Sequence, residues 1–173
     1  MLKQIFAKLR LEISPSLERE YLGAVRDILA NEKVRSMREF TQHGGVSCLE
    51  HSLYVSCTAF LVCRKLGLDS RCAARGGLLH DFFLYDWHTD RPPFRGLHGI
   101  IHPRVSLGNA LRYFPLNKLE REIIARHMWP LTLTPPAHRE TLVVCMADKY
   151  CAFMEWADLS GMRHVKRICA QFS

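Results

Sequence analysis

The chain has 173 residues, of which 48% are hydrophobic and 24% charged. This length and composition are enough to bury a core and predict one domain. Its 24 Lys and Arg against 17 Asp and Glu give a formal charge of +7, which favours anionic partners. The basic residues are scattered, and the absence of a basic stripe interleaved with aromatic residues argues against nucleic acid as the partner.

Seven cysteines are spread singly along the chain, with no Cys-x-x-Cys pair. An odd number of separate thiols indicates a reduced, cytoplasmic protein in which most cysteines are small core residues. The segment 1–10 is amphipathic, and its charges interrupt any signal-peptide core. The best apolar run elsewhere, 53–63, is too short to span a bilayer, so no membrane segment is expected.

The first predicted helix runs from about residue 15 to residue 31. Helical periodicity dominates the chain and strand-like alternation is hard to find, which predicts an all-α, compact bundle of about seven or eight helices. A short helix near 34–41 follows and ends in the glycine-containing loop 42–46. The first helix carries one apolar stripe at four-residue spacing, made by Leu17, Tyr21, Val25 and Leu29.

Ser47 and Glu50 predict a capping box that opens the next helix, with Ser at the cap and Glu three residues later. This accounts for Glu50 structurally, and we assign it no catalytic role. The helix is expected to stop at Gly67, and it is apolar on almost every side, as is typical of a buried central helix. His51 lies in or near its first turn.

Asp69 or Ser70 is predicted to cap a further helix, which carries the apolar run 78–84 and ends near Trp87. The stretch 88–102 contains Pro92-Pro93 and two glycines, which predict a loop, and a loop of this length is usually functional. Pro103 suits the first position of the helix that follows. The remaining predicted helices cover about 103–113, 116–128, 138–157 and, as a basic C-terminal helix, 161–170.

Two polar residues, His80 and Asp81, interrupt the apolar run 78–84. A buried carboxylate costs several kcal/mol (roughly) unless a partner or a metal compensates it. Asp148 poses the same problem, because it follows the apolar stretch 142–147. These two acids are therefore the strongest sign of a site in the chain.

Each remaining histidine is weak evidence when taken alone. His51 fits a satisfied core histidine, His127 fits a cation at the end of a helix, and His102 fits an ordinary loop residue. One or two cations would nevertheless compensate all of these groups at once. Imidazole and carboxylate together suit Mn, Fe, Co, Ni or Zn, and the cysteines do not group with them as a structural zinc site requires.

The order His51, then His80-Asp81, then Asp148 resembles the HD-domain superfamily of metal-dependent phosphohydrolases. The residues around these positions also fit, and the resemblance covers roughly 42–153. It rests on three motifs, Glu50-His51-Ser52-Leu53-Tyr54-Val55, Gly77-Leu78-Leu79-His80-Asp81 and Met146-Ala147-Asp148-Lys149-Tyr150. It implies a single HD-type helical domain over 1–173, with its core at about 42–157.

The resemblance also implies a metal site. In that superfamily, the residues that match His51, His80, Asp81 and Asp148 hold one metal ion. Members with two metals have two further histidines before the last Asp, and His102 and His127 look like these two. One or two divalent ions are therefore expected, with Asp81 as the bridging and catalytic carboxylate.

The chain departs from the family pattern at two places. Phe82-Phe83-Leu84 follows the doublet where many members have Ile-Gly-Lys, so a lysine that often helps to contact phosphate is absent. Met128-Trp129-Pro130 follows His127 and does not match the motif of the cyclic-dinucleotide phosphodiesterases, which argues against that activity.

The activity implied by the resemblance is hydrolysis of a phosphomonoester or phosphodiester, such as a nucleotide or another small phosphorylated metabolite. A bound divalent ion would make hydroxide available at neutral pH. His98 and Lys149 are expected near the substrate, with Arg104 as a further basic candidate. The residue that would donate a proton to the leaving group is left open among His43, His88 and His98.

Three alternatives remain open. The first is a non-catalytic metal-binding or nucleotide-binding module that kept the ligands and lost turnover. The second is an HD-type oxygenase with two irons in a similar ligand shell. The third is a helical interaction protein without metal. The sequence does not indicate an oligomeric state.

Overall fold

The computed structural model describes residues 14–42, 45–87 and 97–156. These residues form seven α-helices and one 3-10 helix and contain no β-strand, which confirms the all-α class. The predicted helix 161–170 and the segment 1–10 lie outside the described residues. The elements are α2 (Pro15–Leu29), α3 (Glu32–Arg35), η1 (Ser36–Glu39), α4 (Cys48–Leu66), α5 (Ser70–Leu79), α6 (His98–Tyr113), α7 (Lys118–Arg126) and α8 (Arg139–Trp156).

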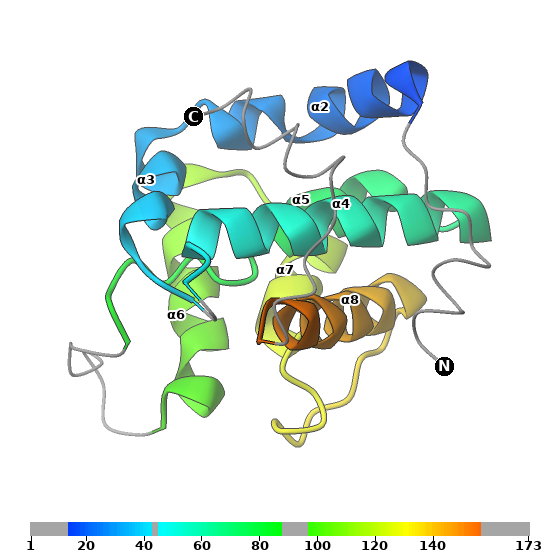
Figure 1. Ribbon diagram of the computed structural model, residues 1–173. Helices are drawn as coiled ribbons and strands as arrows, with labels where there is room; N and C mark the ends of the chain where they lie inside the picture. The colour runs from blue at the N-terminus through cyan, green and yellow to red at the C-terminus, as the bar shows by residue number, and fades with distance from the viewer. Residues whose placement is uncertain (1–13, 43–44, 88–96, 157–173) are drawn as a thin grey trace.

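Helix α4 is the centre of the bundle. Its predicted capping box is present, since Ser47 accepts a hydrogen bond from the amide of Glu50 and Glu50 accepts one from the amide of Ser47. The helix ends at Gly67, whose φ of 66° is left-handed and suits a residue without a side chain. Fourteen of its nineteen residues are buried. Figure 1 shows α4 and α5 crossing the middle of the molecule, with α2 on one side and α8 on the other.

Two glycines allow α5 to lie close to its neighbours. A Cβ on Gly77 would lie 3.1 Å from the Cα of Ser56 in α4, and a Cβ on Gly76 would lie 2.6 Å from Cγ2 of Ile123 in α7. Tyr21 of α2 fixes the same region, because its hydroxyl donates to Oγ of Ser56. Ser56 in turn donates to the carbonyl of Ala74. Helix α5 is therefore held between α4 and α7 at short range.

The predicted end of this helix near Trp87 is wrong, because α5 ends at Leu79 with His80 as its C-cap. The chain turns there: the amide of Phe83 bonds to the carbonyl of Asp81 at 2.8 Å, and Leu84 has a φ of 57°. Phe82 and Phe83 are buried in the irregular segment that follows. A run of apolar residues has the same sequence pattern in a buried helix and in a buried irregular segment. The pattern therefore does not mark the end of α5.

Helix α6 also differs from its prediction, because it begins at His98 instead of Pro103. Pro103 lies inside the helix, one turn beyond its start. The predicted loop 88–102 is therefore wrong in its last five residues, 98–102. The correction matters because His98 and His102, four residues apart on one helix, share a face.

The remaining boundaries fall close to those predicted. The first predicted helix corresponds to α2, and α7 opens with a capping box between Asn117 and Glu120. The six described cysteines are all buried free thiols. No described helix combines the length and the apolar character needed to traverse a bilayer.

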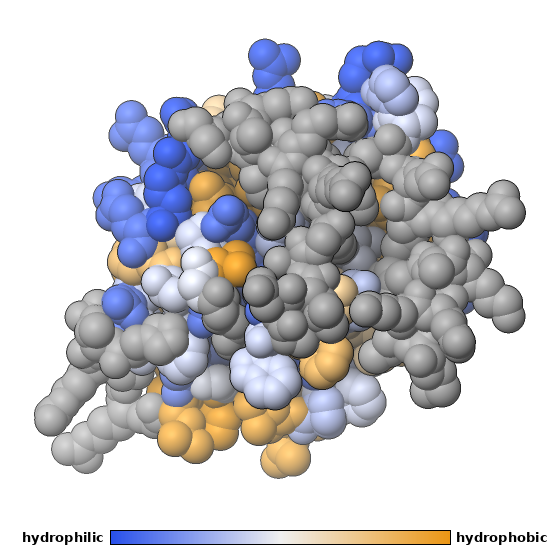
Figure 2. Space-filling view, in the orientation of Figure 1, coloured by the Kyte–Doolittle hydropathy of each residue, from blue (hydrophilic) through white to orange (hydrophobic). Residues whose placement is uncertain are grey.

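Apolar side chains gather at the lower edge of the molecule in Figure 2, where Figure 1 shows the start of α6 and the connection from α7 to α8. Leu97, Ile100, Leu131 and Leu133 are exposed here, and Leu133 is 96% exposed. The start of α6 and the connection from α7 to α8 lie close together at Gly99, since a Cβ at this position would lie 3.0 Å from Cδ2 of Leu131. This apolar edge borders the end of α6 that carries His98.

Candidate metal centre

The structure brings together all six residues predicted as metal ligands. All of them are buried. Their side-chain donor atoms form three overlapping groups, and within each group the atoms lie within 4.8 Å of one another. The six come from four helices and the turn after α5: His51 from α4, His80 and Asp81 from the turn after α5, His102 from α6, His127 from the end of α7 and Asp148 from α8.

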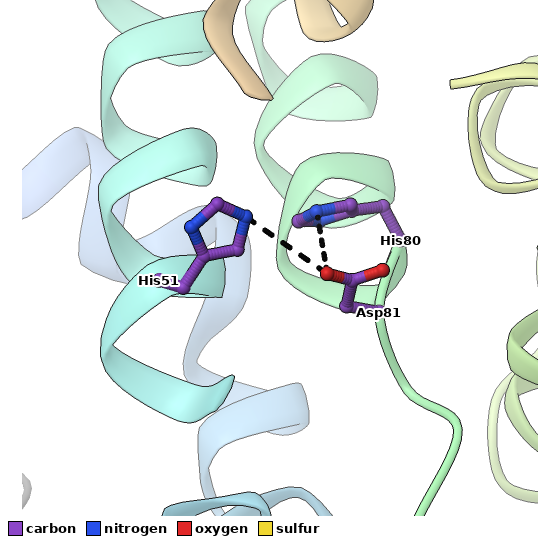
Figure 3. A group of neighbouring side chains, drawn as sticks. All are labelled: His51, His80 and Asp81. Atoms are coloured by element: carbon purple, nitrogen blue, oxygen red, sulfur yellow. Dashed lines mark ion pairs between the residues drawn. The ribbon is translucent and has the colours of Figure 1, made fainter. Parts of the chain in front are cut away.

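Asp81 lies in the middle of the cluster, and its two oxygens face different pairs of imidazoles. Oδ2 is 3.3 Å from Nε2 of His80 and 3.9 Å from Nε2 of His51. Oδ1 is 3.2 Å from Nε2 of His102 and 3.7 Å from Nε2 of His127. Figure 3 shows the first pair, with both ring nitrogens directed at the same carboxylate oxygen. This arrangement suits a carboxylate that bridges two cations.

The two oxygens of Asp81 divide the cluster into two halves, and one of the three ligand groups, made by His80, His127 and Asp148, draws on both. The His51 half contains His51, His80, Asp148 and the Oδ2 atom of Asp81. In it, Oδ1 of Asp148 lies 3.2 Å from Nε2 of His51 and 3.7 Å from Nε2 of His80. The His102 half contains His102, His127 and the Oδ1 atom of Asp81, and its two imidazole Nε2 atoms are 2.8 Å apart.

Three of the four imidazoles are oriented by a backbone carbonyl on their own segment. Nδ1 of His80 lies 2.7 Å from the carbonyl of Gly77, Nδ1 of His102 lies 2.9 Å from that of His98, and Nδ1 of His127 lies 2.9 Å from that of Ile124. A carbonyl can only accept, so the proton is on Nδ1 in each bond. In the neutral imidazole the lone pair of Nε2 then points into the cluster, which is the arrangement of histidines that ligate metals.

Two buried atoms of the cluster have no hydrogen bond, namely Nε2 of His80 and Oδ1 of Asp81. Both lie close to groups of opposite polarity, but with no hydrogen-bond geometry. Leaving such an atom unpaired costs about 1–3 kcal/mol, and native structures rarely do so without a reason. A cation between the side chains would satisfy the imidazole nitrogen and the carboxylate oxygen together.

The cluster also favours positive charge. Burial alone would lower the pKa of both His51 and His80, but the surrounding carboxylates raise the pKa of His51 to about 9 and that of His80 to about 10. Burial would likewise raise the pKa of Asp81, yet His80 and His102 hold it well below its usual value. His127 differs, because burial and then its charged neighbours lower its pKa to about 3. Without metal, protons therefore supply the positive charge.

His98 lies beside the cluster and belongs to none of the ligand groups of the described residues. Its ring lies between those of Trp87 and His102, with centroids 4.9 and 4.7 Å away, and its Nδ1 is 2.9 Å from the hydroxyl of Tyr85. Its backbone carbonyl holds Nδ1 of His102. His98 therefore supports a neighbouring imidazole from the side.

Lys149 lies at the solvent edge of the cluster. Its Nζ donates to the carbonyls of His127 and Cys145 and lies 4.0 Å from Oδ2 of Asp148. Its side chain is 42% exposed, so the ammonium can meet both solvent and the cluster. Arg104 is an exposed residue of α6, and His43 and His88 lie outside the described residues.

Two residues of the site were missed in the sequence. Nε2 of the buried Gln42 donates to Oδ2 of Asp81 at 2.6 Å. The carboxylate oxygens of Glu155 lie 3.1 and 2.9 Å from Nδ1 of His51. Glu155 follows Asp148 by two helical turns, so the heptad spacing on an expected helix was a signal for it. Gln42 had no comparable signal, because it belongs to a polar loop.

Comparison with known proteins gives one finding. A family model described as HD domain matches residues 48–152, more than half of the chain. No curated protein and no solved structure matched the chain. All six predicted ligands lie inside the matched segment, whereas Gln42 and Glu155 lie outside it. The chain therefore belongs to the HD-domain family, whose members are generally metal-dependent phosphohydrolases.

Proposed function

We propose that this chain is a metal-dependent phosphohydrolase that cleaves a phosphomonoester or phosphodiester, such as a nucleotide or another small phosphorylated metabolite. The observation that carries the proposal is the environment of Asp81. Each of its oxygens faces its own pair of imidazoles in a buried cluster, and one of them has no hydrogen bond. Cations held by these imidazoles would compensate a carboxylate in this position.

The donor atoms fit one or two divalent ions. Four imidazole nitrogens and two carboxylates, with no thiolate among them, suit Mn, Fe, Co, Ni or Zn better than Ca or Mg. The His51 half would hold one ion with His51, His80, Asp148 and Asp81. The His102 half would hold a second with His102, His127 and Asp81. When bound, such ions lower the pKa of water from about 15.7 towards about 7 and neutralise phosphoryl oxygens.

The residues around the ligands have roles suited to a phosphate ester. Asp81 fixes the two halves relative to each other. Lys149 holds an ammonium beside Asp148 at the solvent edge, where it would attract the anionic substrate and stabilise charge on its oxygens. His98 fixes the ring of His102 by stacking and is placed to contact a substrate that enters beside Trp87.

The proposal is tested with protein purified without chelator. Metal content is measured first, and then hydrolysis of a panel of phosphomonoesters and phosphodiesters with Mn²⁺, Co²⁺, Ni²⁺, Zn²⁺ and Mg²⁺. We expect hydrolysis that chelator abolishes and metal restores. Asp81→Ala should release the metal and lower the rate by about 10³-fold or more, since a bound ion supplies several kcal/mol.

Asp27→Asn is the matched control, because Asp27 is a paired carboxylate of α2 outside the cluster. It should keep both metal and activity. The site assignment is wrong if Asp81→Ala retains metal and hydrolyses as fast as the wild type. Tight nucleotide binding without turnover would favour the non-catalytic module, and iron-dependent oxygen consumption would favour the oxygenase.

A further inference from the structure

The two halves of the cluster differ in what holds their imidazoles from behind. His80, His102 and His127 each have Nδ1 on a neutral backbone carbonyl. His51 alone among these four has a carboxylate there, with both oxygens of Glu155 within 3.1 Å of its Nδ1. The difference is specific to the His51 half.

The burial of Glu155 makes this contact more than an ordinary ion pair. The carboxylate side chain is 1% exposed and that of His51 is 0% exposed. Asp148 and Glu155 lie two turns apart on α8, so one face of this helix supplies both a candidate ligand and the group behind another. They approach opposite sides of the same ring, since Asp148 is 3.2 Å from Nε2 of His51.

A second buried carboxylate shows why the partner matters. Glu120 is buried to the same degree, but it accepts from Arg75, whose charge is permanent. An imidazole that ligates a metal through Nε2 is neutral. Within the described residues the ion pair of Glu155 is with His51, so a cation on the far side of the ring would compensate this buried carboxylate. Glu155 is placed as a group that acts on a cation through His51.

We propose that Glu155 is a positioning residue that makes the His51 half the tighter of two metal positions. The inference rests on the proposed function only in needing metal to bind. Glu155 accepts a hydrogen bond from Nδ1 of His51 and so fixes the ring. It also adds a negative charge to the half that already contains Asp148. The His102 half shares Asp81, and its two imidazoles have neutral backbone carbonyls at Nδ1. Partners of this kind typically change metal affinity by about 10–100-fold.

The test measures the binding of Mn²⁺ or Co²⁺ alone, by competition with a chromophoric chelator, and needs no substrate. The wild type should bind in two steps of unequal affinity. Glu155→Gln keeps the shape and an acceptor oxygen but removes the charge, and should weaken the tighter step by about tenfold or more while leaving the weaker step unchanged. Glu155→Asp keeps the charge at shorter reach and should fall between the two.

A His102→Ala background shows whether the tighter binding step belongs to the His51 half. This variant should bind in a single step, and adding Glu155→Gln should weaken that step by the same factor. Glu120→Gln is the matched control, since it removes an equally buried carboxylate and should lower the Tm without changing either affinity. Equal wild-type steps, an unchanged tighter step in Glu155→Gln, or a loss confined to the weaker step would overturn the inference. A wild type that binds no metal would instead contradict the proposed function itself.

Discussion

Helix α5 and the turn that follows it contribute to two groups of charges around buried side chains, and the two groups are built in opposite ways. At Arg75, Nε donates to Glu120 at 2.8 Å, and Nη1 donates to Asp27 at 2.6 Å and to the carbonyl of Ala24 at 3.0 Å. No side-chain atom of this network is buried without a hydrogen bond. Five residues later, at His80 and Asp81, two buried atoms are left without one.

The contrast separates a structural use of buried charge from a functional one. The Arg75 network is closed, because its opposite charges lie in the same molecule and satisfy one another. The cluster around Asp81 is open, because its carboxylates, and its imidazoles once they are neutral, direct lone pairs at a common centre. Burial alone would have marked both groups as unusual. The two unsatisfied atoms distinguish the second group as a candidate binding site.

The largest change in stability is expected when the closed network is broken. Arg75→Met leaves Glu120 buried without its cation, which should lower the free energy of unfolding by about 3 kcal/mol or more. Denaturant unfolding measures this loss. Metal affinity should stay at its wild-type value, and a parallel loss of metal would show that the two groups are not separate.

Metal removal should affect the open cluster alone. At a concentration of 100 times the Kd, a metal that binds only the folded chain adds about 2.7 kcal/mol of stability. Thermal unfolding with and without chelator should show this shift in the wild type and in Arg75→Met. Asp81→Ala should lose the shift, and a metal-dependent Tm that persists in this variant would place the ion elsewhere.

The response to pH should also differ between metal-free and metal-loaded protein. The pKa values of His51 and His80 are raised to about 9 and about 10 without metal, so their contribution to stability is full below pH 6.5 and is lost as the pH rises through those values. Metal binding must displace these protons, so its affinity should rise over the same range, by at most about tenfold per pH unit for each proton released. Thermal shifts from pH 6 to 9 measure both trends. A metal-induced shift that shrinks with pH would contradict the assignment.

The smallest effect is expected at an exposed pair that belongs to neither group. Arg64 donates to Glu20 at 3.1 Å, with side chains 55% and 46% exposed. Glu20→Gln should change the free energy of unfolding by less than about 1 kcal/mol and leave metal binding unaltered. This variant sets the baseline for the others, measured in the same denaturant titration.

The ligand positions could be predicted because polar residues interrupt apolar runs at His80, Asp81 and Asp148. Such interruptions are costly unless they serve a site, so they are visible without a structure. The end of α5 was not visible, because Phe82 and Phe83 are buried whether the chain is helical or not. Periodicity reports burial more directly than backbone conformation.

The supporting residues were harder to predict for a different reason. Glu155 stands next to the exposed Trp156 near the end of α8, where a charged residue is usually solvated. Gln42 reaches Asp81 only through the folding of a loop onto α5. Their roles depend on contacts between segments more than 35 residues apart, which no local pattern records.

The absence of side chains at Gly76 and Gly77 bears on how the candidate ligands are spaced. At Gly77 the main chain of α5 lies almost against that of α4, so the spacing between the helices that carry His51 and His80 is set by backbone contact. A methyl group at Gly76 would overlap the side chain of Ile123 in α7, and one at Gly77 would press on the backbone of Ser56 in α4. The spacing between the segments that carry the candidate ligands is thus set in part by two residues that contribute no side chain to the cluster.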